Sequence, residues 1–138
     1  MKKIYSLLIV LLFVAGCSTK GNVFSLGVGD CFDDPDGIEI ANVDLVDCNE
    51  AHTNEVYATA DLPDGDYPFG SLESDVWDIC YGAFESFVGE EYEWSMYEIG
   101  GLWPTQDSWE KADDREVVCY LYDMFGGTKT GTAANSGL

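Results

Sequence analysis

The spacing of apolar and polar positions changes twice along the chain. Residues 54–61 alternate between apolar and polar side chains, and this period of two predicts a strand. Residues 71–88 repeat apolar side chains every three or four positions, which predicts an amphipathic helix that ends at Gly89. Alternation returns at 116–122 and favours a final strand. Shorter apolar runs predict further strands at 25–32, 38–47 and 94–99.

The order of these elements, three strands, one helix and two strands, predicts a single α+β domain. We expect a small antiparallel sheet covered by one main helix, within residues 26–125. The small polar residues of 126–138 predict a disordered tail. Residues 17–25 are predicted to form a short tether in front of the domain.

The start of the chain has the pattern of a lipoprotein signal peptide at 1–16. Lys2 and Lys3 precede an apolar run that is shorter than the roughly 20 residues needed to cross a bilayer. Val-Ala-Gly-Cys at 14–17 then resembles a bacterial lipobox, so we expect Cys17 to carry lipid at the start of the mature protein. Acyl chains would hold the domain at the cell membrane, facing outside the cytoplasm. An ordinary signal peptide with a chance cysteine is the alternative.

The chain is strongly acidic, with 26 Asp and Glu against six Lys and Arg and a net charge of −20. Cleavage after residue 16 removes two lysines and no acid, so the net charge of the mature protein becomes −22. Such a surface repels nucleic acid and anionic headgroups, which leaves the lipid as the only membrane contact. Solubility, as in a saline habitat, is the simplest interpretation, and attraction for a cation or a basic partner is the alternative.

Four cysteines remain once Cys17 is assigned to the lipid. In a small exported domain they predict two disulfides, with three connectivities open. A metal site is the alternative, but the chain has no Cys-x-x-Cys pair and a single histidine, so we expect no metal and no cofactor. The four residues are Cys31, Cys48, Cys80 and Cys119.

Several blocks, in the same order along the chain, resemble the septum-formation domain family. The Gly-Asp-Cys-Phe of 29–32 and the segment 46–56 resemble its Gly-Asp-Cys and Val-x-Cys-x-x-Pro-His-x-x-Glu-Val motifs. Cys80 fits its central helix. Segments 104–109 and 114–119 resemble its Pro-Thr-x-x-Ser-Trp and Gly-Asp-Arg-x-Val-x-Cys motifs.

The similarity covers residues 26–122, with Ala51 and Asp113 in place of the family's usual Pro and Gly. The resemblance implies an exported or membrane-tethered domain whose family name suggests division or envelope work, without an established chemistry. The neighbouring family blocks and the short separation favour one disulfide pairing, Cys31–Cys48 with Cys80–Cys119.

Four polar residues are candidates for a functional or structural role. His52, the single histidine, lies three positions before Glu55 and would act as a pH sensor, metal ligand or general base. The interpretation that we favour is structural: His52 fixes the turn after Cys48 by bonding to backbone or to Glu55. Ser108 is conceivable as a nucleophile, but its motif predicts the first turn of a helix. Arg115 is predicted to have a structural role, with its guanidinium bound in a bidentate way to a nearby carboxylate.

Two acidic loops and a set of aromatic residues are weaker candidates. The loops at 33–37 and 61–66 hold carboxylates and glycine, but neither has the twelve-residue pattern of a calcium loop, and turn chemistry accounts for them. Four aromatic residues could present a surface to a glycan or a peptide, although we expect at least half of them in the core. They are Trp94, Tyr97, Trp103 and Trp109.

The sequence thus predicts a non-catalytic binding module of the cell envelope, anchored by lipid at Cys17. Its expected partners are the membrane, through the anchor, and an envelope protein or glycan. A small envelope hydrolase or metal-dependent enzyme using His52 and nearby carboxylates is the alternative. A third interpretation is a surface lipoprotein whose acidity is only an adaptation to salt.

Overall fold

The computed structural model describes residues 20–22, 25–34 and 42–138. The predicted signal peptide and Cys17 lie outside the described residues. Within the described residues the fold has six strands and three helical segments: β1 (Lys20–Asn22), β2 (Cys31–Phe32), β3 (Asn42–Val46), β4 (Asn54–Asp61), α1 (Leu72–Val88), η2 (Tyr92–Trp94), β5 (Tyr97–Leu102), α2 (Gln106–Ala112) and β6 (Glu116–Asp123).

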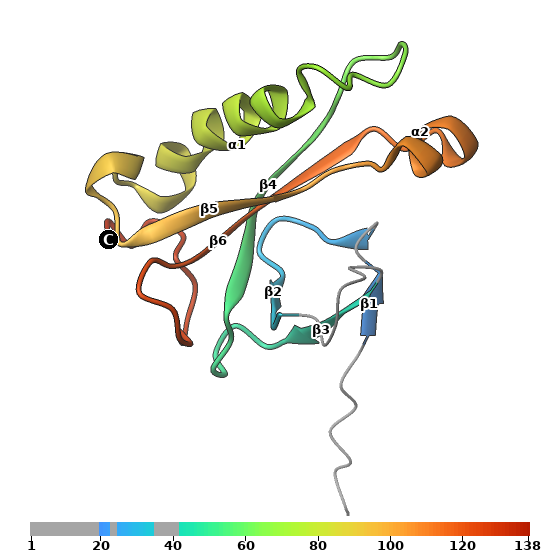
Figure 1. Ribbon diagram of the computed structural model, residues 1–138. Helices are drawn as coiled ribbons and strands as arrows, with labels where there is room; N and C mark the ends of the chain where they lie inside the picture. Colours follow the sequence, from blue (N-terminus) through green and yellow to red (C-terminus); the bar gives the residue numbers. More distant parts are fainter. Residues whose placement is uncertain (1–19, 23–24, 35–41) are drawn as a thin grey trace, which may run out of the picture.

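The strands form one antiparallel sheet in the order β1-β3-β2-β4-β6-β5. Figure 1 shows α1 lying across the β4, β5 and β6 part of the sheet, while β1, β2 and β3 curl away on the other side. The predicted α+β class, with one main helix on a small antiparallel sheet, is confirmed. Within the described residues, no helix is long and apolar enough to cross a membrane.

The main helix buries one stripe of side chains against the sheet. Its fully covered residues recur every four positions, which places them on a single face. Gly89 ends the helix in the left-handed conformation (φ 83°), and its N–H donates to the carbonyl of Glu85. The predicted helix and its stop therefore agree with the structure. The buried residues are Leu72, Val76, Cys80, Phe84 and Val88.

The sheet has apolar side chains on both faces because successive residues of a strand point in opposite directions. Tyr57 of β4 and Val117 of β6 belong to the cluster beneath α1. Their neighbours Val56 and Val118 belong to a second cluster, together with Phe32 of β2. This second cluster is the reason that the short strands curl over the far face of the sheet.

The two disulfides pair Cys31 with Cys48 and Cys80 with Cys119. The first joins β2 to the turn after β3, and the second joins α1 to β6 across the main core. The pairing favoured by the family resemblance is confirmed.

The strand predicted at 94–99 is shifted towards the C-terminus. Trp94 ends the short helix η2, and the strand β5 starts at Tyr97 and runs through two glycines. A Cβ on Gly100 would lie 2.3 Å from the ring of Tyr120, so this glycine is a packing position within the strand and not a turn.

Two segments expected to lie outside the domain belong to the fold. Part of the predicted tether forms β1, which pairs with β3. The C-terminal segment differs more strongly from its prediction of disorder, because Ala133 is fully buried in the core beneath α1. Composition missed this segment because its contacts are made largely by backbone groups, which small polar residues provide as well as any others.

Candidate functional site

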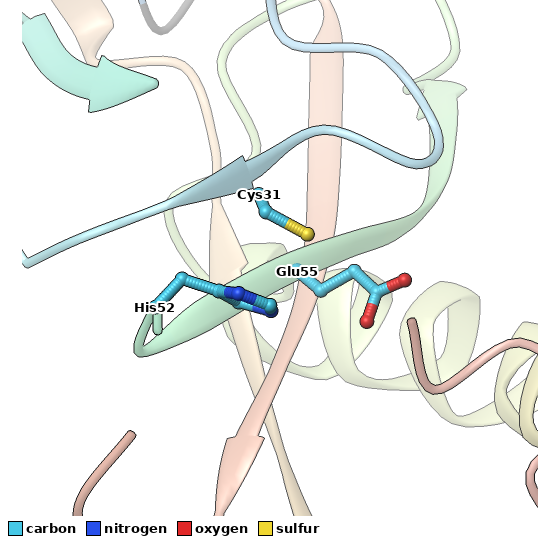
Figure 2. A group of neighbouring side chains, drawn as sticks. All are labelled: Cys31, His52 and Glu55. Carbon is cyan, nitrogen blue, oxygen red and sulfur yellow. The ribbon is translucent and has the colours of Figure 1, made fainter. Parts of the chain in front are cut away.

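Three residues singled out by the sequence lie together beside the start of β4. Figure 2 shows Cys31, His52 and Glu55 close together, Cys31 from β2 and Glu55 from the neighbouring β4, with the carboxylate of Glu55 directed away from the other two. One sulfur, nitrogen or oxygen atom of each lies within 4.8 Å of the others. All three side chains are buried, so this cluster belongs to the interior of the protein.

The carboxylate of Glu55 is fully buried and accepts bonds from three donors of the C-terminal segment. Lys129 forms an ion pair with it, and the hydroxyl of Thr132 donates to its other oxygen. The backbone N–H of Ala133 donates at 2.8 Å. A buried charge is tolerated when it is paired and hydrogen-bonded in this way.

The C-terminal segment is therefore an ordered part of the domain, which corrects the expectation of a disordered tail. Lys129 exchanges two backbone hydrogen bonds with His52, of 2.8 and 3.0 Å. Asn135 and Gly137 donate backbone N–H groups to the last carbonyls of α1, those of Phe87 and Val88. The segment covers Glu55 and satisfies the end of the helix at the same time.

His52 is fully buried, and its Nδ1 lies 2.9 Å from the backbone carbonyl oxygen of Glu50. A carbonyl oxygen can only accept, so Nδ1 carries a proton and donates in that contact. Nε2 has no hydrogen-bond partner among the described residues. The ring thus makes the backbone contact that a turn-fixing role requires, and its hydrogen bond goes to Glu50 and not to Glu55.

The donor atoms of this cluster do not suit a metal ion in the disulfide-bonded protein. The sulfur of Cys31 is bonded to Cys48 and is no thiolate. The oxygens of Glu55 are already taken by Lys129 and two further donors. Chemically, the cluster is suited to holding the C-terminal segment against β4.

Ser108 lies in the first turn of α2. Its N–H donates to the hydroxyl of Thr105 (3.1 Å), and its own hydroxyl accepts from the N–H of Thr105 (3.0 Å), which is a capping box. The hydroxyl also donates to Asp114 at 2.9 Å. No hydrogen bond joins Ser108 to His52 among the described residues, so the two do not form a nucleophile–base pair.

Arg115 lies over the ring of Trp109, with 3.8 Å between the guanidinium carbon and the ring centroid. It pairs with Asp113 at 2.9 Å and with Asp64 at 3.5 Å, and so binds two carboxylates instead of one bidentate partner. Arg115 and these two carboxylates line an open hollow of about 590 Å³. Burial, together with nearby Asp61 and Asp114, raises the pKa of Glu116 at its rim.

The four aromatic residues considered in the sequence do not form one surface. Tyr97 and Trp109 are buried, whereas Trp94 and Trp103 are exposed. Half of the set is therefore in the core.

A different group of aromatic residues gathers on the outer side of α1. Trp77 and Tyr81, one helical turn apart, have ring centroids separated by 5.8 Å. Tyr92 of η2 packs edge-on against both, at 5.7 and 5.9 Å. Trp77 and Tyr81 are 43% and 42% exposed. We call these three residues the aromatic patch.

Two of the three residues of the aromatic patch are marked by their spacing in the sequence. Trp77 and Tyr81 are spaced by four, so they share one side of the helix, at the edge of its apolar stripe. Tyr92 could not be added from the sequence, because its position depends on how the chain turns after Gly89.

Both tyrosine hydroxyls of the aromatic patch donate hydrogen bonds to carboxylates. Tyr81 donates to Glu93 and Tyr92 donates to Glu98, each at 2.6 Å. The hydrogen bond to Glu98, with partial burial, raises the pKa of Tyr92 to about 12. The hydrogen bond from Tyr81 lowers the pKa of Glu93, because it stabilises the carboxylate. The patch is therefore both aromatic and anionic.

The structure defines a class of protein: a small, disulfide-bonded α+β domain with an acidic aromatic surface. A buried ion pair joins its C-terminal segment to the sheet. A family model described as septum formation matches residues 28–135, which include most of that segment. The chain belongs to the septum-formation family.

Two curated relatives also match the chain. Proteins from Mycobacterium tuberculosis and Mycobacterium bovis, both named as a proposed lipoprotein, LppN, are 29% identical over 113 residues. The match covers 79% of this chain and 62% of each relative, so the chain spans less than two thirds of the relatives' length. No solved structure matches the chain.

Proposed function

We propose that this protein is an envelope-associated, lipid-anchored interaction module that faces outside the cytoplasm and acts by binding. The family name, septum formation, and the relatives' name of lipoprotein support an envelope protein. The lipobox-like motif at 14–17 supports attachment through Cys17. The net charge of −20 supports a lipid anchor over electrostatic attachment to anionic headgroups.

The observation that carries the binding role is the aromatic patch. Trp and Tyr are the residues most often found at the energetic centre of protein interfaces. Here two such side chains stay more than 40% exposed on the outer side of a helix, although the same chain buries Tyr97 and Trp109. We propose that the exposed part of this patch contacts the partner.

The catalytic alternative has less support in the geometry. The ring of His52 is fully buried beside the C-terminal segment, and the hydroxyl of Ser108 is engaged within its capping box. A general base needs access to the substrate proton that it removes. A binding role needs no such access to the interior.

The anchor is tested by Cys17→Ser in cells fed with labelled palmitate. We expect the wild-type protein to carry the label, and the variant to lose it and to accumulate uncleaved or unanchored. Cys48→Ser together with Cys31→Ser serves as the control for loss of a cysteine elsewhere, and should keep the label. A labelled Cys17→Ser protein would contradict the anchor.

The binding surface is tested by photo-crosslinking on living cells. p-Benzoylphenylalanine in place of Tyr81 keeps an aromatic ring in the patch, and the same group in place of exposed Glu50 provides the control at a distant turn. We expect crosslinked products from position 81 and none of the same mass from position 50. Identical products at both positions, or none at 81, would contradict a binding role for the patch.

A further inference from the structure

The carboxylates around the aromatic patch restrict the chemistry of what it binds. Glu93 and Glu98 accept from Tyr81 and Tyr92, each at 2.6 Å. Each carboxylate offers about four acceptor positions, so one tyrosine donor leaves most of them open. The hydrogen bond to Glu93 is the main reason that the pKa of Tyr81 is raised, and the nearby charges of Glu91 and Glu85 raise it further.

The cations of the described part of the chain are engaged away from the patch. Among the described side chains outside β1, Lys111 pairs with Asp107, Arg115 with Asp113 and Asp64, and Lys129 with Glu55. None of these three cations contacts the carboxylates of the patch. The negative charge of the patch is therefore available to a positively charged partner.

The protein itself contains the contact that such a partner would make. The guanidinium carbon of Arg115 lies 3.8 Å from the ring centroid of Trp109, and Arg115 forms ion pairs with Asp113 and Asp64. Trp77 packs against Tyr81 and Tyr92, whose hydroxyls donate to Glu93 and Glu98, but no cation covers its ring among the described residues. Tryptophan is the ring that attracts a cation most strongly.

We propose that the aromatic patch binds an arginine- or lysine-bearing peptide segment of another envelope protein. The cationic group lies against Trp77, and Glu93 and Glu98 accept its hydrogen bonds. A neutral glycan would stack on the same rings but would gain nothing from the carboxylates around them. Anionic polymers are repelled, and so is a second copy of this acidic chain. The inference rests on the proposed binding role of the patch.

The test measures binding of a labelled peptide with six arginines alternating with six glycines to the full-length protein in neutral detergent. We expect Trp77→Ala to weaken binding about five- to tenfold, and Glu93→Gln by a smaller factor. Phe69→Ala removes a more exposed aromatic ring outside the patch, and Glu50→Gln removes a charge elsewhere. Each control is expected to change the affinity less than about twofold, since Phe69→Ala matches Trp77→Ala in net charge and Glu50→Gln matches Glu93→Gln.

Equal effects of Trp77→Ala and Phe69→Ala would overturn the inference, because binding would then not depend on the ring of Trp77 in particular. A neutral N-acetylglucosamine tetramer serves as the second probe. If it binds in a Trp77-dependent way and the arginine peptide does not, the partner class is wrong while the binding role stands. Loss of dimers in Trp77→Ala, seen by light scattering, would instead identify a second copy as the occupant. Absence of crosslinks at position 81 would contradict the binding role itself.

Discussion

Lys129 forms an ion pair with Glu55, 74 positions earlier in the chain, and so fastens the C-terminal segment to β4. The side chain of Lys129 is 11% exposed and that of Glu55 is fully covered. In this environment water solvates neither charge well, and each depends on the other. The stability of the domain therefore depends on a segment whose composition predicts no structure.

The first prediction concerns this ion pair. Lys129→Met leaves the Glu55 carboxylate buried without its cation and should lower the free energy of unfolding by about 3–5 kcal/mol. Lys111→Met is the control, because Lys111 and Asp107 are both 73% exposed; it should cost less than about 1 kcal/mol. Urea denaturation measures both. A loss for Lys129→Met no larger than for the control would show that the segment is not fastened by this pair.

The second prediction tests the structural role of His52. His52→Ala removes a buried ring and its hydrogen bond to the Glu50 carbonyl, and should lower the free energy of unfolding by about 1–3 kcal/mol. Capture of the partner by the folded variant should be unchanged. Glu50→Ala, which keeps that carbonyl and removes an exposed side chain, provides the control. An unchanged melting curve with lost cellular function would favour the enzyme alternative.

The third prediction concerns the disulfides, which close loops of 17 and 39 residues. In the loop-entropy model they stabilise the fold by about 3 and about 4 kcal/mol, as upper values. Replacing Cys80 and Cys119 by alanine should therefore destabilise the protein more than replacing Cys31 and Cys48. Peptide mapping without reductant checks the pairing, and a peptide joining Cys31 to Cys80 would refute it.

The fourth prediction concerns alkaline pH and Tyr92. Its pKa rises from an ordinary value near 10 to about 12 in the folded protein, first because of the hydrogen bond to Glu98. The folded state therefore favours the protonated tyrosine. The resulting stability is complete below about pH 10 and is lost as the pH rises to about 12. Unfolding free energies between pH 9 and 12 should fall less steeply for Tyr92→Phe than for wild type.

Tyr57, Tyr97 and Tyr120 contribute to the same slope, because burial raises the pKa of each. Some pH dependence should therefore remain in Tyr92→Phe. Tyr67→Phe removes a hydroxyl that donates to a backbone carbonyl, that of Pro104, and provides a matched control. A Tyr92→Phe curve that parallels wild type over this range would contradict the role of Glu98.

Local patterns were sufficient for the central elements of the fold. α1 follows from its apolar period and from Gly89, and the strands at 54–61 and 116–123 follow from alternation. These features depend on residues a few positions apart, where backbone geometry fixes which side chains share a face. The capped turn at Ser108 has the same local origin. The boundaries of β5 were less predictable, because Gly100 is set by its contact with Tyr120 on the next strand.

The candidate site was predictable only in part. The motif identified His52 and Glu55, but not what Glu55 binds, since its donors come from residues 129–133. The aromatic patch likewise joins two residues of α1 to Tyr92, which reaches them only because the chain reverses after the helix.

The sequence by itself determined the class of fold, the main helix and the two central strands, because periodicity and turn residues act over a few positions. Through its family motifs it also indicated which cysteines pair. Only the tertiary structure decided that the C-terminal segment is ordered and that the outer side of α1 carries an acidic aromatic surface. Both depend on groups far apart in the chain, whose attraction appears only after the core has brought them within hydrogen-bonding or van der Waals distance.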